Sequence, residues 1–239
     1  DRGGSLLIMS DVVFTDDAFL KEDGAFNQYL WDNYGSRALD AAVVDPDASG
    51  QSPLDVISAA VFTDTDIGAR LDPSADTPTL FRLARAVDVN LTNAPQNVAN
   101  GRVIMTTAMG YGETNLASLG ATNTYSFDAE SDIVGPVSTV VWASNLTNDS
   151  RIVLIGDSDF VTNGQVLNGG NGILFTDSLV WLSRYGDQVE FAPQVFAASL
   201  PTVFVSQQQI DFVVFLTVLL LPAAILVAGL SIWARRARR

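Results

Sequence analysis

Arg151-Ile-Val-Leu-Ile-Gly-Asp-Ser-Asp-Phe160 joins a run of apolar residues to a loop that carries two carboxylates and a serine. A short apolar run of this kind predicts a strand that is buried on both faces. In open α/β sheets, ligands bind outside the carboxyl ends of the strands. The segment therefore predicts a central strand over 151–155 and a candidate site in the loop that follows it.

Segments elsewhere in the chain repeat the pattern of a strand and a helix. Residues 6–9 predict a second buried strand, and the apolar positions within 17–34 predict a helix that stops at Gly35. Residues 173–185 predict an amphipathic helix that ends before Gly186. Such alternation favours an α/β fold with a mostly parallel sheet flanked by helices. Further strands are expected at 41–44, 56–62, 103–107 and 137–143, and 80–87 fits either a strand or a helical turn.

The loop after residue 155 holds the candidate site, in which Asp157 and Asp159 are the potential metal ligands. Hard cations such as Mg²⁺ and Ca²⁺ take carboxylate and carbonyl oxygens as ligands. Amide side chains that follow in the sequence are Asn163, Asn168 and Asn171. The spacing of two aspartates around one residue has low specificity, however. The alternative is that these residues fix the turn by accepting hydrogen bonds from backbone N–H groups.

The C-terminal residues predict a membrane anchor. Residues 212–234 carry no charge, and at about 1.5 Å of rise each they would form a helix of about 35 Å, enough to cross a hydrocarbon core of about 30 Å. Basic flanks mark the cytoplasmic side of a membrane helix, so we expect the rest of the chain outside the cytoplasm. Proline and glycine within the span predict a kinked helix beside partner helices. The anchor residues are Phe212, Pro222, Gly229, Trp233, Arg235, Arg236, Arg238 and Arg239.

These observations divide the chain into four parts. We expect an extracytoplasmic α/β domain over 1–187, an extended linker over 188–210, a transmembrane helix over 211–234 and a basic cytoplasmic tail over 235–239. The sequence opens with Gly3-Gly4 directly before an apolar strand, which looks like the turn out of a helix. We therefore expect the domain to lack its N-terminal part, and a signal peptide or membrane span to precede it.

The composition excludes several kinds of function. The chain contains no cysteine and no histidine, which rules out disulfides, thiolate nucleophiles, zinc sites of Cys or His and Ser-His-Asp triads within it. Residues 1–234 hold 9 basic and 27 acidic residues, a net charge of −18. Nucleic-acid binding needs clustered basic residues, so no nucleic-acid partner is expected. No cofactor is expected either.

Several blocks of sequence resemble GldG-like proteins, the auxiliary, membrane-anchored components of ABC-type transport systems associated with gliding motility. The most specific block runs over 152–160, continues through Asn168-Gly-Gly-Asn171 and ends in the helix at Leu179-Val-Trp-Leu182. The apolar span with Leu221-Pro222 and Gly229 also fits this family. Looser agreement lies upstream, at Gly3-Gly4-Ser-Leu-Leu, Tyr34-Gly35, Val43-Val-Asp-Pro46 and 80–87.

The resemblance implies an α/β domain with a class-I-glutamine-amidotransferase-like sheet, held outside the membrane by spans at both ends. The family's domain is not established as a catalyst, and this chain has neither the cysteine nor the histidine that an amidotransferase would need. The family's first membrane helix and opening strands have no counterpart here. Nothing in the chain resembles a nucleotide-binding loop, so an ATPase and the main permease would be separate polypeptides.

Three functions remain as hypotheses. The leading one is a non-catalytic extracytoplasmic auxiliary subunit of an ABC-type membrane complex, located in the cell membrane as a single-pass chain. The alternative is a structural or accessory subunit of another large membrane assembly. The third is a metal-dependent hydrolase or ligand-binding domain that uses Asp157 and Asp159.

Overall fold

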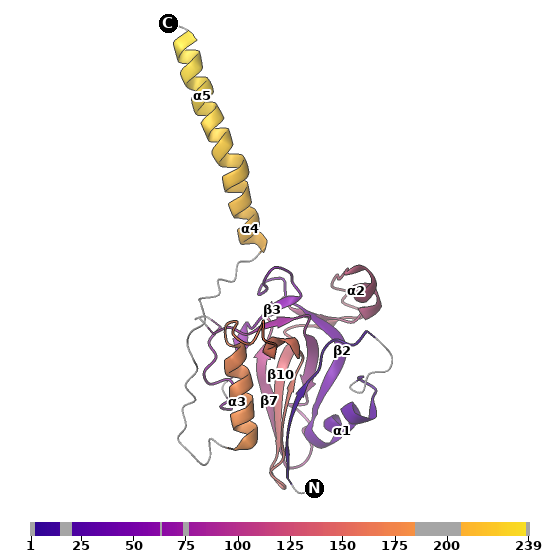
Figure 1. Cartoon of the computed structure of the whole chain (residues 1–239). Helices are drawn as coiled ribbons and strands as arrows, with labels where there is room; N and C mark the ends of the chain where they lie inside the picture. The colour runs from indigo at the N-terminus through magenta and orange to yellow at the C-terminus, as the bar shows by residue number, and fades with distance from the viewer. Residues whose placement is uncertain (1–2, 15–20, 63, 74–76, 185–206, 238–239) are drawn as a thin grey trace. The chain divides into compact units, whose positions relative to one another are not determined.

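The computed structural model describes residues 3–14, 21–62, 64–73, 77–184 and 207–237. It divides the chain into two compact units, Asp1–Thr202 and Val203–Arg239. The first unit is the α/β body and the second is helical (Figure 1). The predicted linker lies outside the described residues over 188–206, and so do Arg238 and Arg239 of the basic tail.

The body is built around a nine-stranded sheet with the order β1-β11-β10-β6-β2-β8-β9, in which β7 pairs with β10 and β4. A second sheet of two strands pairs β3 with β5. The bounds of the main-sheet strands are β1 Ser5–Met9, β2 Ser36–Val44, β4 Ala60–Val61, β6 Arg85–Val89, β7 Val98–Met105, β8 Tyr111–Glu113, β9 Ile133–Val134, β10 Ser138–Asn145 and β11 Arg151–Ile155. The small sheet consists of β3 Asp55–Ile57 and β5 Leu80–Arg82.

The prediction of a mostly parallel sheet is wrong. The pair β1–β11 is parallel, whereas the other pairings of the described strands are antiparallel. A parallel neighbour needs a crossover of a dozen or more residues, whereas a short turn returns the chain antiparallel. Residues 146–150 form such a turn between β10 and β11, closed by the side chains of Asn145 and Asn148, which accept hydrogen bonds from the N–H groups of Thr147 and Ser150.

The strands themselves lie close to where the apolar runs predicted them. Strand β11 has the predicted bounds, and β1, β2, β7 and β10 contain or overlap their predicted segments. Two predicted runs are each divided between two strands: 56–62 contains the end of β3 and all of β4, and 80–87 contains β5 and the start of β6. Leu83, between β5 and β6, has a positive φ of 52°, so the chain turns there and the two strands enter different sheets.

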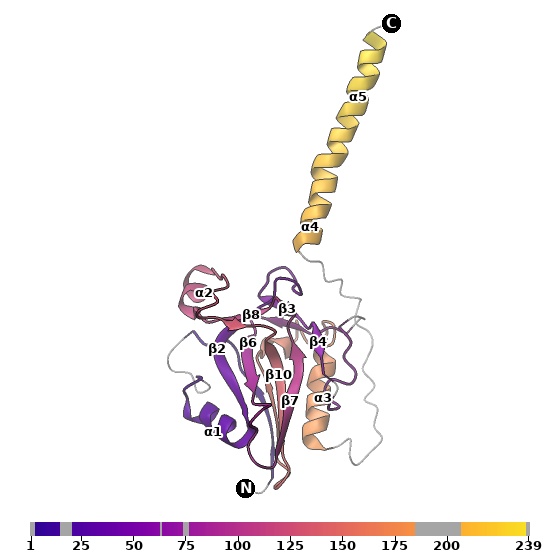
Figure 2. The same ribbon diagram turned by 180° about the vertical axis from the view of Figure 1, so that it is seen from behind.

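Two helices cover opposite faces of the main sheet, as both views show (Figures 1 and 2). Successive side chains of β11 alternate between the two cores. Val153 and Ile155 pack with Leu174 and Leu182 of α3 (Asn171–Ser183). Ile152 and Leu154 pack with Leu30 of α1 (Ala25–Tyr34). This two-sided burial explains why the strand is apolar at every position from Ile152 to Ile155 and shows no period of two.

The helices differ from their predicted extents at the ends. Helix α1 begins at Ala25 and ends at Gly35, which adopts the left-handed conformation with φ 64°; the predicted start at 17–20 lies outside the described residues. Helix α3 ends at Arg184, also left-handed, and the predicted stop at Gly186 is likewise outside them. The body also contains α2 (Leu116–Thr122) and a 3₁₀ turn, η1 (Asp159–Val161).

The second unit is a continuous helical segment made of α4 (Gln207–Val214), a π-helical stretch η3 (Phe215–Leu220) and α5 (Leu221–Ala237). Pro222 explains the π-helical stretch, because proline has no N–H to donate and its ring clashes with the carbonyl four residues earlier. Widening the preceding turn is one way to accommodate this clash. The segment Asp211–Leu230 is long and apolar enough to cross a membrane.

Candidate functional site

The predicted site loop follows β11, and Asp157 is buried within it with 1% of its surface exposed. Its Oδ2 accepts a hydrogen bond from the N–H of Arg82 at 2.8 Å, and its Oδ1 accepts one from the N–H of Asp159 at 2.7 Å. The first bond ties the loop to strand β5, and the second holds the start of the 3₁₀ turn. Asp157 therefore fixes the local backbone, as the turn-fixing alternative anticipates.

The environment of Asp157 makes its ionised form costly. Burial raises the pKa of Asp157 to about 6 from the ordinary 3.8, although the two backbone N–H groups favour the charged form. The carboxylates of Asp11 and Asp159 raise this pKa further by repulsion. A buried carboxyl with a raised pKa is a common mark of functional sites, but structural carboxyls show it too.

Asp11 brings the end of β1 into the same loop. Its two carboxylate oxygens accept hydrogen bonds from the N–H of Ser158 at 2.6 Å and from the hydroxyl of Ser158 at 2.7 Å. Asp159 is exposed and begins the 3₁₀ turn. The carboxyl ends of the parallel pair β1 and β11 thus carry neighbouring acidic groups, two of them engaged by backbone donors. No group of three or more acidic, His or Cys residues suited to a metal ion occurs in the described part of the chain, and the cation site stays a prediction.

The nearby amides divide into a buried and a peripheral set. Asn171 is fully buried, and its side chain exchanges two hydrogen bonds with the backbone of Leu80, at 2.8 and 3.0 Å. Its Nδ2 is also within hydrogen-bond distance of the carbonyls of Phe160 and Gln165. Asn168 is half-buried and donates within its own turn, to Gln165. Asn163 is exposed. Asn171 is therefore a structural link between the site loop, α3 and β5.

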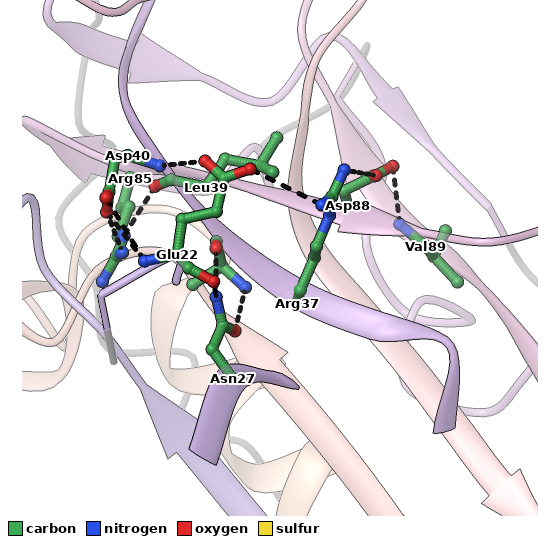
Figure 3. A network of polar contacts seen from close by, with 9 residues as sticks. Glu22, Asn27, Arg37, Leu39, Asp40, Arg85, Asp88 and Val89 are labelled. Atoms are coloured by element: carbon green, nitrogen blue, oxygen red, sulfur yellow. Dashed lines mark hydrogen bonds and ion pairs between the residues drawn. The ribbon is translucent and has the colours of Figure 1, made fainter. Parts of the chain in front are cut away.

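Sequence reasoning missed a buried ion-pair network around Arg85, which Figure 3 shows in part. Arg85 lies in β6 and has none of its surface exposed. Its guanidinium donates to the carbonyl of Leu39 at 2.7 Å, to the hydroxyl of Ser10 at 2.9 Å and to the carboxylate of Asp40 at 2.6 Å. Burial lowers the pKa of Arg85, while Asp40 raises it. The arginine thus joins β2, β6 and the residue that follows β1 through one charged group.

The network continues to the surface through Glu22 (Figure 3). The carboxylate of Asp40 accepts a hydrogen bond from the N–H of Glu22 at 3.2 Å, and the carboxylate of Glu22 accepts one from the N–H of Asp40 at 3.1 Å. Glu22 and Asp88 both pair with Arg37, at 3.5 and 3.3 Å. A hollow of about 410 Å³ adjoins these groups. Its charged lining holds three carboxylates and two arginines: Glu22, Asp40, Asp88, Arg37 and Arg102.

The charges of this network serve mainly to hold strands together. Arg37 bridges two carboxylates, and Asp40 pairs with the buried Arg85. The one sequence signal was an arginine at the start of the apolar run Arg85-Ala-Val87, a position where a charge is buried only if it is paired.

The anchor residues lie in the second unit. Phe212 and Trp233 are exposed, at 64% and 69%, near opposite ends of the apolar stretch. Pro222 and Gly229 lie within α5, and Arg235 and Arg236 lie in its last turn. Arg238 and Arg239 are outside the described residues. Every described side chain from 211 to 230 is exposed.

Comparison with known proteins gives a likeness of fold. No family model matches the chain, and no curated protein matches it. A solved structure described as "mmIFT52 N-terminal domain" is similar, with 12% sequence identity and a TM-score of 0.50; the likeness covers 76% of this chain and 66% of that one. The chain thus spans just under two thirds of that structure's length. At this identity the likeness concerns the fold, and function has to be argued from the site.

Proposed function

We propose that this protein is a non-catalytic auxiliary subunit of an ABC-type membrane transport complex. In this proposal its α/β body lies outside the cytoplasm and residues 211–234 anchor it in the membrane. The observation that carries the proposal is the exposed apolar helix Asp211–Leu230. Its 20 residues extend over about 30 Å at 1.5 Å each, which is the thickness of a hydrocarbon core.

The anchor is supported by the cost of leaving this helix in water. The free energy falls by about 25 cal/mol for each Å² of apolar surface that is removed from water. Soluble proteins rarely expose large contiguous apolar patches, and such patches mark membrane or protein contacts. Over 212–230, the side chains around the whole helix are exposed and mostly apolar. This favours a helix that is surrounded by lipid over one that lies in a groove of a single partner protein. Arg235 and Arg236 at the end of α5 favour a cytoplasmic C-terminus.

An auxiliary role is supported by what the body offers chemically. The chain has no cysteine or histidine, and both oxygens of Asp157 are engaged by backbone N–H groups. The transporter assignment rests on the resemblance to GldG-like proteins, which implies a separate permease and a separate ATPase. The alternative is an accessory subunit of another large membrane assembly, for which the same anchor and the same body would serve.

Mass spectrometry of the proteins that co-purify with the chain in a mild detergent tests this proposal. We expect a multi-span permease and an ATPase in fixed ratio, whereas a different stable assembly would replace the proposal by its alternative. A Leu219→Arg, Leu220→Arg variant should lose both partners, because each arginine near the centre of a span costs about 2.5–3.5 kcal/mol on insertion. Leu167→Arg, an equal change at an exposed position of the body, should keep them.

Protease treatment of right-side-out vesicles tests the orientation. The body should be digested in intact vesicles, because the arginines hold the C-terminus on the cytoplasmic side. An Arg235→Glu, Arg236→Glu variant should show a mixed orientation and partial protection. A body that is fully protected in the unsubstituted protein, and digested only after detergent is added, would refute the extracytoplasmic placement.

A further inference from the structure

The hollow beside the buried network contains an arginine that the network does not use. Arg102 lies in β7 and lines this hollow of about 410 Å³. Arg37 and Arg85 each form an ion pair with a carboxylate of the network. Within the described part of the chain, the guanidinium of Arg102 forms no ion pair or hydrogen bond, and its Nε is buried without an acceptor. A partly buried charged group without a partner is costly, so the charge of Arg102 requires an explanation outside the network.

A second polar group of the hollow also lacks a partner. Ser138 begins β10, lines the hollow and is 5% exposed. It pairs with Val87 of β6 and with Met105 of β7, which places it between these two strands. Its hydroxyl makes no hydrogen bond to any residue that the structure describes. Buried hydroxyl groups are normally hydrogen-bonded, so the wall of the hollow holds an unused hydroxyl as well as an unused guanidinium.

The remainder of the wall is largely apolar. Ile133 and Val134 of β9 line it, together with Pro136 and Val137 of the segment that leads into β10. Val134 is 68% exposed, whereas Val137 is buried. Sites for small molecules are hollows of about 300–1,000 Å³ with apolar walls and a few polar groups that fix the ligand. The volume and the lining of this hollow agree with that description.

The charges of the hollow limit the charge of a ligand. Each of its three carboxylates pairs with Arg37 or Arg85, and with Arg102 the three arginines balance them. A single negative charge can therefore pair with Arg102, whereas the nearby carboxylates disfavour a ligand with two or more. A carboxylate matches the guanidinium fork and can accept two parallel hydrogen bonds from it. The apolar wall further favours an organic anion over an inorganic one.

We infer that this hollow binds a small organic carboxylate with a short apolar body. The carboxylate would pair with Arg102 and accept a hydrogen bond from the hydroxyl of Ser138, while the apolar body would lie against Ile133 and Val134. Such a ligand satisfies both groups that the network leaves without partners. The inference goes beyond the proposed function and does not rest on it, because all residues of the hollow belong to the body.

Titration of the full chain with sodium butyrate in detergent micelles tests the inference. Butyrate carries one charge on a short alkyl chain, and sodium chloride at the same ionic strength is the reference. The backbone NMR signals of Ile133, Val134 and Ser138 should shift with a saturable dependence on butyrate. Butanol has a similar body without the charge and should bind at least about tenfold more weakly, because it cannot form charge-assisted hydrogen bonds with Arg102.

Two pairs of variants locate the binding. Arg102→Gln should weaken butyrate binding at least about tenfold, because it removes the charge. Arg184→Gln, the matched control at an arginine outside the hollow, should bind within about twofold of the unsubstituted chain. Val134→Asp adds a like charge and should weaken binding about fivefold at low salt, whereas Val134→Asn should change it by less than about twofold. Because Val134 is exposed, this pair covers the case in which Arg102→Gln does not fold.

Several results would overturn the inference. Absence of a saturable shift with butyrate is one, and equal binding by Arg102→Gln and the unsubstituted chain is another. Tighter binding of inorganic phosphate than of butyrate would contradict the class of ligand. Saturable shifts with an acetylated acidic peptide and none with butyrate would assign the hollow to a protein partner instead. Failure of a permease and an ATPase to co-purify, with butyrate binding intact, would refute the proposed function alone.

Discussion

Asp157→Asn tests how the buried carboxyl of the site loop contributes to stability. The pKa of Asp157 is about 6 in the folded chain, against 3.8 for an ordinary aspartate. Between pH 3.8 and about 6 the folded state therefore holds one proton that the unfolded state has lost. Stability falls with rising pH wherever the folded state binds more protons. The protonated carboxyl of Asp157 thus stabilises the fold fully below pH 3.8, and this stabilisation is lost as the pH rises through about 6.

The magnitude follows from the same two values. Each pH unit between them corresponds to 1.36 kcal/mol, so the contribution amounts to about 3 kcal/mol, which full burial leaves unscreened by solvent. Asparagine has no such titration, but its amide can accept only one of the two backbone N–H bonds and leaves the other donor unsatisfied, at about 1–3 kcal/mol. The stability of the variant relative to the unsubstituted chain should therefore rise by about 2 kcal/mol between pH 4 and pH 7. The variant should be less stable near pH 4 and equally or more stable at pH 7.

Urea unfolding followed by circular dichroism from pH 4 to pH 8, in a non-ionic detergent, measures this difference. Asp32→Asn is the matched control, because this carboxyl is exposed on α1, and its stability should differ from that of the unsubstituted chain by less than about 0.5 kcal/mol. A stability difference for Asp157→Asn that stays constant over the range, or that grows toward high pH, would refute the reasoning and would mean that the ionised form is stabilised in the fold.

Three further predictions concern the loop and the buried network. If Asp157 and Asp159 bind a cation, calorimetric titration with Ca²⁺ or Mg²⁺ gives heat that Asp157→Ala abolishes, and absence of heat with both ions ends that hypothesis. Asp40→Ala should destabilise the body by about 3 kcal/mol, because it removes the carboxylate that pairs with the buried guanidinium of Arg85 at 2.6 Å; Asp32→Ala, at an exposed carboxylate, should change stability by less than about 0.5 kcal/mol. Asn171→Leu should cost about 3 kcal/mol in chemical unfolding, since it leaves backbone groups of β5 buried without partners, and a loss below about 1 kcal/mol would contradict this account.

Local signals located the elements better than they located the site. The run 151–155 indicated a strand because both of its faces are buried, and the burial of Val153 and Leu154 in different cores confirms that reason. The same residues suggested a ligand loop, and the structure places Asp157 there as a backbone acceptor. The carboxylates, their position after a strand and the turn chemistry were all visible in the sequence. Which donors would reach Asp157 was not, because Arg82 comes from a strand 75 residues away.

The parallel sheet was predicted because strands and helical stretches alternate along the chain. The prediction gave too much weight to helices. Within 98–155, β10 pairs antiparallel with both β7 and β11, and the described helix in this segment, α2, has seven residues. The turn residues Asn145 and Asn148 hold the β10–β11 hairpin, and these side chains were a signal that could have corrected the prediction. Arg85 was missed because partners far away in the sequence, among them Ser10 and Asp40, explain why a charge lies in an apolar strand.

The sequence by itself determined the features that depend on neighbouring residues: the apolar runs that become strands, the uncharged C-terminal helix with its basic end, and the exclusion of chemistry that needs cysteine or histidine. Only the tertiary structure decided the direction in which strands pair, the pairing of β1 with β11 and the partners of Arg85. The physical reason is that hydrophobicity and helix propensity act over a few residues. Pairing direction and burial of a charge are fixed by contacts between segments far apart, such as the bond between Ser10 and Arg85 across 75 residues.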